Sequence, residues 1–216
     1  KIKIRTNSTD IMQLGTVWLV EDYEVSGFNI NNEDIVIDIG AHIGLFSLFV
    51  SQYCKNGKIF SYEPIKKNFR ILKENIELNK IKNIIYFNSA VSNQSNKLKI
   101  FIDSDDSAHS IFESDRDFIE VNSTTIKSIF DENKIKKCNL LKLDCEGAEY
   151  QIIESIPKEY FLKIDKMIIE YHKANENPKL YKKLIQNLKD NSFKIKIEPI
   201  SEGMGMIYAL NMNKMK

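Results

Sequence analysis

Four acidic residues stand at or near the ends of apolar runs that are typical of β-strands. They are Asp38, Glu63, Asp144 and Glu170. The carboxyl ends of parallel strands meet at one edge of a sheet, so these side chains are expected to gather at a single crevice. Carboxylates there can accept hydrogen bonds from hydroxyl groups, attract a cation or take a proton from a reacting group. The residues around each acid indicate which of these it does.

A tight glycine turn follows the first of these runs. Residues 35–39 are isoleucine or valine apart from Asp38, which suits a central parallel strand that is buried on both faces. Gly40 and Gly44 then bracket a turn that leads into a predicted helix. A strand, a glycine turn and a helix N-terminus can bring bare backbone N–H groups against a ligand. We therefore interpret residues 35–48 as a nucleotide-cofactor loop.

The loop departs from the dinucleotide-binding fingerprint, which has three glycines at G-x-G-x-x-G spacing. Its own pattern is D-x-G-x-x-x-G, beginning at Asp38. That carboxylate would repel a pyrophosphate but could attract a cationic amino-acid group, directly or through water. S-adenosylmethionine carries such a group. The expected cofactor contacts in this loop are Asp38, Gly40, Ala41, His42 and Gly44.

A second short strand ends in Glu63 and Pro64, and Glu63 comes 25 residues after Asp38. An acid about 20 residues beyond a cofactor loop, at the tip of the neighbouring strand, accepts hydrogen bonds from ribose hydroxyls. Glu63 fits that role, with Pro64 beside it. The alternative is an ordinary surface glutamate ahead of a helix that a proline starts.

A third run, residues 140–143, also ends in acids and a glycine before a predicted helix. Its string L-K-x-D-x-E-G-x-E, together with D-x-G-A-x-x-G-x-F-S, Y-E-P and I-I-E-Y-H, resembles the FkbM family of S-adenosylmethionine-dependent methyltransferases. The likeness covers roughly residues 17–209, and L-K-x-D-x-E-G-x-E is its most specific part. The first motif is shared by many class I methyltransferases.

The resemblance implies an O-methyltransferase that acts on a hydroxyl of a sugar, glycolipid, polysaccharide or polyketide-like small molecule. Asp144 would form a wall of its cofactor site. Ser89 and Ala90 stand where class I methyltransferases contact the adenine ring. Many of those enzymes place an aspartate where this chain has Ser89, which leaves the bond to the adenine amino group open; backbone groups could supply it instead.

Methyl transfer to a hydroxyl benefits from a base that removes the proton, besides close positioning of the acceptor. His172 is the first choice of base, because an imidazole titrates near neutral pH, and Glu170 could orient it. The alternative is that Glu146 and Glu149 brace the following helix through its dipole, while Glu170 and His172 satisfy backbone groups or each other.

The same strand tips also raise the question of a metal. Two or three carboxylates and a histidine are acceptable ligands for Mg²⁺ or Mn²⁺, and Asp144, Glu146, Glu170 and His172 could supply them. The resemblance is to a family usually described without a metal, so no metal site is predicted.

The order of predicted elements indicates an α/β fold. We expect a doubly wound, mostly parallel, seven-stranded Rossmann-like sheet with an antiparallel last strand, as in class I methyltransferases. Two alternating runs, 98–102 and 118–121, predict an inserted β-hairpin around a polar loop at 103–117. His109 on that loop could reach the site, although a solvent-exposed loop histidine is the plainer interpretation.

Two segments make up the predicted domain organisation. Residues 1–30 are expected to form an N-terminal extension that covers the cofactor site, as the resemblance implies, and residues 31–216 a single methyltransferase domain. Tyr23 in the extension is a possible cofactor contact, or one of several aromatics that pack an entry helix on the sheet.

Composition narrows the class of protein. The chain has 216 residues, 43% of them hydrophobic, enough for one substantial core. Its net charge of +1 gives no basic excess, so nucleic acid is not an expected partner. Three cysteines without C-x-x-C spacing suggest neither a disulfide framework nor a zinc site, which favours a cytoplasmic location. No apolar run reaches the roughly 18 to 20 residues that span a bilayer.

Two other functions fit the same loop. One is a non-catalytic nucleotide-binding module that kept the cofactor site and lost transfer. The other is an NAD-dependent oxidoreductase, which Asp38 and the missing third glycine disfavour.

Overall fold

The computed structural model describes residues 1–6, 8–18, 28–101 and 117–214. Its helices are α1 (Asp10–Trp18), α2 (Leu45–Ser51), α3 (Lys66–Leu78), α4 (Ile126–Glu132), α5 (Glu149–Ser155), α6 (Lys158–Phe161) and α7 (Pro178–Asp190), with a short 3₁₀ turn at Met212–Lys214. Its strands are β1 (Ile35–Ile39), β2 (Lys58–Tyr62), β3 (Ile84–Phe87), β4 (Ala90–Val91), β5 (Lys97–Phe101), β6 (Phe118–Thr124), β7 (Leu140–Leu143), β8 (Lys166–Tyr171), β9 (Phe193–Ser201) and β10 (Met204–Asn211).

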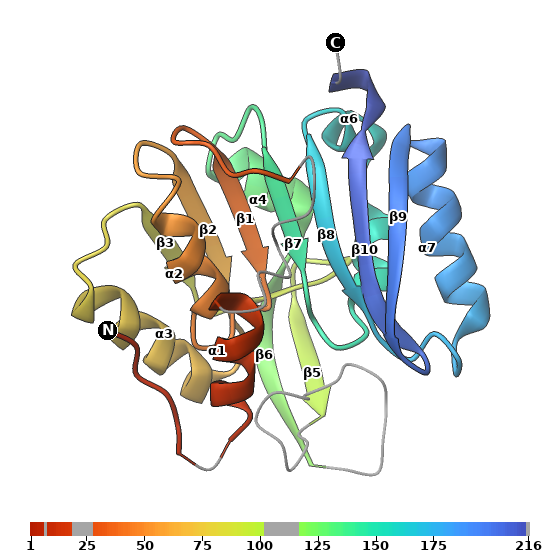
Figure 1. Cartoon of the computed structure of the whole chain (residues 1–216). Coiled ribbons are helices and arrows are strands. Elements are labelled where there is room, and N and C mark those ends of the chain that lie inside the picture. The colour runs from red at the N-terminus through yellow and green to blue at the C-terminus, as the bar shows by residue number, and fades with distance from the viewer. Residues whose placement is uncertain (7, 19–27, 102–116, 215–216) are drawn as a thin grey trace.

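Seven of these strands form one sheet in the order β3-β2-β1-β7-β8-β10-β9. The pairs from β3 through β8 are parallel, whereas β10 runs antiparallel to both β8 and β9. Figure 1 shows this sheet with β1 and β7 near its middle. The predicted mostly parallel sheet with an antiparallel last strand is therefore confirmed.

Apolar side chains bury both faces of the sheet, as expected for near-continuous isoleucine, leucine and valine runs. One face packs against α1, α2 and α3, in a cluster that includes Leu72 and Ile76. The other packs against α4 to α7, in a cluster that includes Phe130 and Ile152. Because helices cover both faces, the polar ends of the strands are the places left for a ligand.

A second, smaller sheet has the order β4-β6-β5. Strands β5 and β6 pair antiparallel, from Lys97 opposite Asn122 to Phe101 opposite Phe118. This is the hairpin that the alternating runs predict, although β6 extends to Thr124. The parallel strand β4 adds to it, which the sequence pattern does not indicate for so short a segment. Residues 103–116 of the hairpin loop, His109 among them, lie outside the described residues.

The N-terminal segment packs onto the main core. Val17 of α1 and Phe28 belong to the same apolar cluster as Val36 of β1. Tyr23 lies outside the described residues. A separate extension at residues 1–30 stays a prediction. Among the described helices, none is long and apolar enough to cross a membrane.

Candidate functional site

A cavity of about 610 Å³ opens at the carboxyl ends of β1, β2, β7 and β8. Small-molecule sites fall in this size range and favour this edge of an α/β sheet. Its lining includes most of the residues that the sequence singles out, namely Gly40, Ala41, His42, Glu63, Pro64, Ala90, Asp144, Glu146 and Glu170. Four other predicted site residues, Asp38, Gly44, Ser89 and His172, do not line it.

The glycine turn is built by close backbone contact. Gly40 has a φ of +77°, and a Cβ on it would lie 1.7 Å from the carbonyl oxygen of Asp144. The N–H groups of Gly40 and Ala41 both donate to the carbonyl of Tyr62, at 3.1 and 3.0 Å. We expected bare N–H groups at this turn, but these two are used to join the loop to β2. The turn therefore shapes the cavity floor rather than presenting those donors to a ligand.

Asp38 is buried behind the residues that line the cavity. Its side chain is fully buried and accepts a hydrogen bond from Ser47 Oγ at 2.6 Å. It also faces the Lys142 ammonium at 3.4 Å. A direct contact with a cationic ligand does not fit this position, and the alternative contact through water stays a prediction. Asp38 precedes the last residue of β1, so its carboxylate meets the neighbouring elements rather than the crevice.

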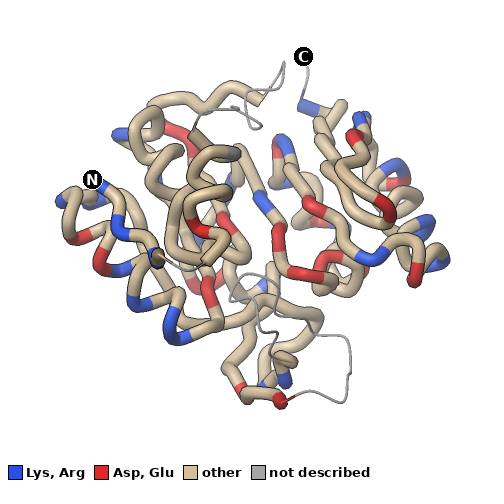
Figure 2. Tube along the Cα trace, turned by 60° about the horizontal axis from the view of Figure 1, so that its bottom comes forward, with Lys and Arg blue, Asp and Glu red and all other residues tan. Residues whose placement is uncertain are grey.

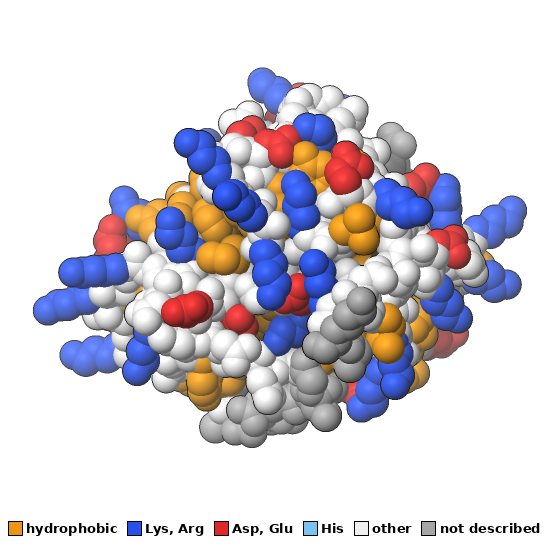
Figure 3. Space-filling view, turned by 90° about the horizontal axis from the view of Figure 1, so that it is seen from above, with side chains coloured by type: hydrophobic (Ala, Val, Ile, Leu, Met, Phe, Trp, Pro, Cys, Tyr) orange, Lys and Arg blue, Asp and Glu red, His pale blue; other side chains and the backbone are white. Residues whose placement is uncertain are grey.

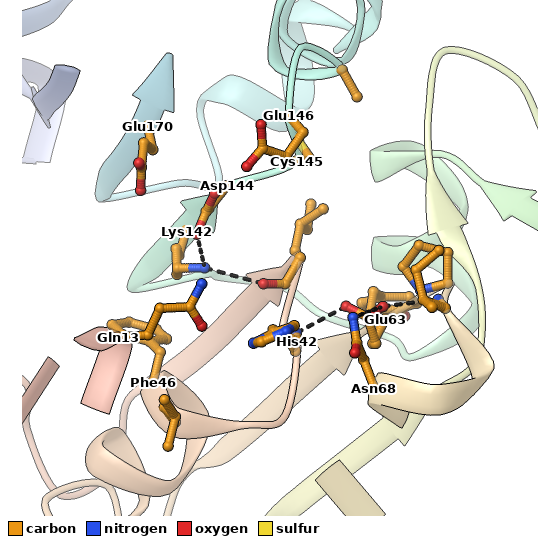
Figure 4. Close-up of a pocket in the computed structure, with 18 of the residues that line it drawn as sticks. Gln13, His42, Phe46, Glu63, Asn68, Lys142, Asp144, Cys145, Glu146 and Glu170 are labelled. Carbon is orange, nitrogen blue, oxygen red and sulfur yellow. Dashed lines mark hydrogen bonds and ion pairs between the residues drawn. The ribbon is translucent and has the colours of Figure 1, made fainter. Parts of the chain in front are cut away.

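Lys142 is the residue that sequence reasoning missed. Its side chain is only 5% exposed, and its ammonium lies 3.4 Å from Asp38 and 3.3 Å from Asp144 while donating to the Gly40 carbonyl (Figure 4). Burial works to raise the pKa of Asp144, but Lys142 and His172 hold that pKa below its ordinary value. The only available signal was a lysine inside an otherwise apolar strand, Leu140–Leu143.

Glu63 is fixed on the opposite side of the cavity. Its two carboxylate oxygens accept from the backbone N–H groups of His42 and Ile65, both at 2.8 Å, and Asn68 approaches at 3.5 Å. Burial raises the pKa of Glu63 to about 7. The Oε2 atom, which accepts from His42, keeps a second lone pair, so the carboxylate can still accept from a ligand hydroxyl.

Apolar side chains form the wall next to Glu63. They come from the small sheet and the start of α3, and include Ile65, Ala90, Val91, Leu98 and Ile100. The Ser89 hydroxyl instead donates to the Ala90 and Asn122 carbonyls, both at 3.1 Å. A side-chain contact from Ser89 to a ligand therefore does not fit this structure.

An N-terminal arginine holds α1 against the cavity, where Thr9, Met12 and Gln13 line it. Arg5 donates to Asp10 and Asn68, and its guanidinium lies 2.7 Å from the Nε2 atom of His42. Burial and then Arg5 lower the pKa of His42 to about 4, so that imidazole is neutral at physiological pH. The sequence offers no signal for the contacts of Arg5 with His42 and Asn68, because these two residues are far from Arg5 in the chain.

His172 sits below the acidic tips of β7 and β8. Its Nε2 atom lies 3.6 Å from Glu170 and 3.7 Å from Glu146, and its Nδ1 atom lies 3.4 Å from the buried Glu149. The expected approach of Glu170 to His172 is therefore present. Burial works to lower the pKa of His172, but these carboxylates raise it to about 11. His172 does not line the cavity, and the carboxylates around it favour its protonated form, so this position does not favour His172 as the general base, and that role stays a prediction.

We expect nuclear magnetic resonance to show two abnormal imidazoles. In ¹⁵N spectra recorded from pH 5 to 9, the signals of His172 should stay those of the cation and the signals of His42 those of the neutral ring. His172→Gln and His42→Gln assign them. A His172 titration near pH 6.5 would restore it as a candidate base.

Asp144, Glu170 and His172 could also approach one cation. Each offers a ligand atom, and these atoms lie within 4.8 Å of one another. A metal would need the neutral form of His172. The proton that its carboxylate neighbours retain therefore competes with metal binding at this cluster.

The sequence matches a known protein family. The family model of the methyltransferase FkbM domain matches residues 38–195. The curated protein Methyltransferase 1 of Beauveria bassiana is 22% identical over 177 residues, which cover 71% of this chain and 70% of that protein.

Solved structures show the same fold. The crystal structure of methyltransferase FkbM from Methylobacillus flagellatus has a TM-score of 0.61 and 15% identity, covering 87% of this chain and 46% of that one. This chain thus spans less than half of that protein. Fibrillarin from Aeropyrum pernix, solved with natively bound S-adenosyl-L-methionine, has a TM-score of 0.53 and 14% identity, covering 93% of this chain and 74% of that one.

Proposed function

This chain belongs to the FkbM methyltransferase family, and from that premise we propose that its cavity binds S-adenosylmethionine for methylation of a hydroxyl group. The proposed acceptor is a sugar, glycolipid, polysaccharide or polyketide-like small molecule. The bound donor supplies an activated methyl group on a positively charged sulfur. The observation that carries the proposal is the placement of fixed carboxylates on opposite sides of one cavity at the carboxyl edge of the sheet.

The two ends of the cavity suit the two ends of the donor. Glu63, held by backbone N–H groups beside an apolar wall, suits the ribose and adenine. At the other end, Asp144, Glu146 and Glu170 present acidic groups that suit a cationic amino-acid and sulfonium end. Between these two ends lie Gly40, Ala41 and His42. The adenine end is bordered by Pro64 and Ala90. Asp38 contributes through Lys142 rather than by contact.

The distribution of charge favours a small acceptor over nucleic acid. Figure 2 shows basic and acidic residues intermixed along α3 and α7. Figure 3 shows many Lys and Arg side chains, with acidic side chains among them, on the face at the amino ends of the parallel strands, away from the cavity. Nucleic-acid binding uses basic groups gathered around the site itself.

The free cysteines Cys54, Cys138 and Cys145 support a cytoplasmic location.

Truncating the Glu63 side chain should weaken cofactor binding. We expect Glu63→Ala to reduce the binding free energy of S-adenosylhomocysteine by about 1 to 3 kcal/mol, because ligand hydroxyls lose their acceptor. Isothermal titration calorimetry measures this loss. Glu154→Ala on α5, where the carboxylate is half-exposed and pairs with Lys183, is the matched control. Equal affinity of the Glu63 variant and the parent would remove Glu63 from the cofactor site.

Ligand-dependent melting and labelled transfer test the function. We expect S-adenosylhomocysteine, not NADH, to raise the melting temperature. Methyl-labelled donor should then label a component of saccharide or small-molecule extracts. Stabilisation by NADH alone would indicate an oxidoreductase. Cofactor binding without transfer to any extract would indicate a binding module, and label in RNA would contradict the proposed acceptor class.

A further inference from the structure

Glu146 occupies an unusual position in the turn that joins β7 to α5. Its φ is +51°, in the left-handed region that a residue with a side chain rarely adopts. Such a conformation costs free energy and persists where surrounding structure enforces it, often at functional sites. The Glu146 side chain is 29% exposed and lines the cavity. Figure 4 shows its carboxyl group near those of Asp144 and Glu170 at one end of the pocket.

The neighbouring groups are poorly suited to accept a proton. Asp144 is neutralised by Lys142, which makes it a weak base. His172 does not line the cavity, and the carboxylates around it raise its pKa, which favours the protonated ring. Glu149 is fully buried, where it accepts from the backbone N–H groups of Gly147 and His172, both at 2.8 Å. Glu146 and Glu170 are the remaining candidates in this cluster; both line the cavity, and the Glu146 side chain is the more exposed of the two.

We propose that Glu146 accepts the proton of the acceptor hydroxyl, and that His172 is a positioning residue that holds the Glu146 carboxylate. This inference rests on the proposed function and assigns the base within it. The acceptor O–H bond breaks and its proton joins a Glu146 oxygen. The acceptor oxygen bonds to the methyl carbon, while the carbon–sulfur bond breaks and its electron pair stays on sulfur. Glu146 then returns the proton to water.

The charges around Glu146 suit this cycle. Burial raises its pKa to about 7, His172 opposes that rise, and the carboxylates around it add to it. The charged groups facing Glu146 are Asp144 beyond β7, Glu149 on α5, and Glu170 and His172 at the tip of β8. A positive sulfonium nearby would favour the ionised carboxylate before transfer. The neutral product would let the carboxyl group hold the proton afterwards.

The donor and its product provide a test that needs no acceptor. We would measure the dissociation constants of S-adenosylmethionine and S-adenosylhomocysteine by calorimetry between pH 6 and 8. The parent should bind S-adenosylmethionine about tenfold more tightly at pH 8 than at pH 6, since a group with a pKa near 7 ionises across this range. S-adenosylhomocysteine has no sulfonium charge, so it should lack this tenfold change and show only the pH dependence that Glu63, whose pKa is also about 7, gives to both ligands.

Three variants identify the side chain that causes this pH dependence of S-adenosylmethionine binding. Glu146→Gln should still bind S-adenosylmethionine but lose the extra pH dependence, whereas the control Glu154→Gln should keep it. His172→Gln should move its midpoint to higher pH, because the cation that favours ionised Glu146 is gone. Parent-like pH dependence in Glu146→Gln, or its loss in Glu170→Gln instead, would overturn the assignment. If the parent binds neither compound, the proposed function itself fails.

The rate of methyl transfer is the second measurement. In the extract fraction that the parent labels, Glu146→Gln should transfer methyl groups at least about a hundredfold more slowly at pH 8, as loss of a general base predicts. Transfer by Glu146→Gln at the parent's rate would contradict the proposal even if the binding results agreed.

Discussion

Replacing Gly40 with alanine should abolish cofactor binding and lower the free energy of unfolding by about 2 to 5 kcal/mol, the sum of a left-handed backbone penalty and overpacking. Gly40 has a φ of +77°, where an added Cβ strains the chain. That Cβ would also lie 1.7 Å from the Asp144 carbonyl oxygen. The glycine turn and the β7 tip would have to separate, and the cavity lies between them.

Denaturant unfolding and titration with S-adenosylhomocysteine measure the two effects in the same protein. Gly15→Ala is a suitable control, because a Cβ on Gly15 of α1 meets nothing within 4 Å. The control should be stabilised by roughly 0.5 to 1 kcal/mol, since alanine favours a helix interior over glycine. A Gly40→Ala protein with parent-like stability and affinity would show that the close approach of the two segments is not required.

Removing the buried ammonium of Lys142 is the second change that should have a large effect on stability. We expect Lys142→Met to lower the free energy of unfolding by about 3 to 5 kcal/mol at neutral pH, the usual cost of leaving a buried charge unpaired. Two carboxylates, Asp38 and Asp144, would lose their counter-ion. Urea denaturation at pH 7 measures the change. Lys137→Met, which removes an exposed ammonium from a pair with the mostly buried Asp165, should cost less, about 1 kcal/mol.

The same variant has a pH signature. The pKa of Asp144 is lower in the folded protein than its ordinary value of 3.8. Its ionised form therefore stabilises the parent above that value, and this contribution is lost as the pH falls through the lowered pKa. The difference in stability between parent and Lys142→Met should be large at neutral pH and shrink below about pH 4. A difference that persists unchanged in acid would mean that lost packing, not charge, explains it.

The fold and the general location of the site could be predicted from local patterns. Apolar runs followed by glycines or acids place the parallel strands, and parallel strands bring their carboxyl ends to one edge. The place of Glu63 at the cavity could be predicted because its spacing after the glycine loop reflects the distance between neighbouring strand tips. The antiparallel β10 followed from the resemblance, and the sheet pairing confirms it.

The roles of individual acids could not be predicted in the same way. A sequence shows that Asp38 lies near the end of a strand, but not that Lys142 reaches it from β7. It shows that His172 follows Glu170, but not that Glu149 and Glu146 also surround the imidazole and keep it protonated. These differences come from pairwise charge contacts between segments about a hundred or about twenty residues apart. Local spacing does not encode such contacts.

A crystal structure with S-adenosylhomocysteine tests the central claim most directly. We expect the ribose hydroxyls to meet the Glu63 carboxylate, the amino-acid end to lie beside Gly40 and Asp144, and the sulfur to face Glu146. A ligand bound outside this cavity, or a cavity that stays closed to it while a dinucleotide enters, would contradict the account.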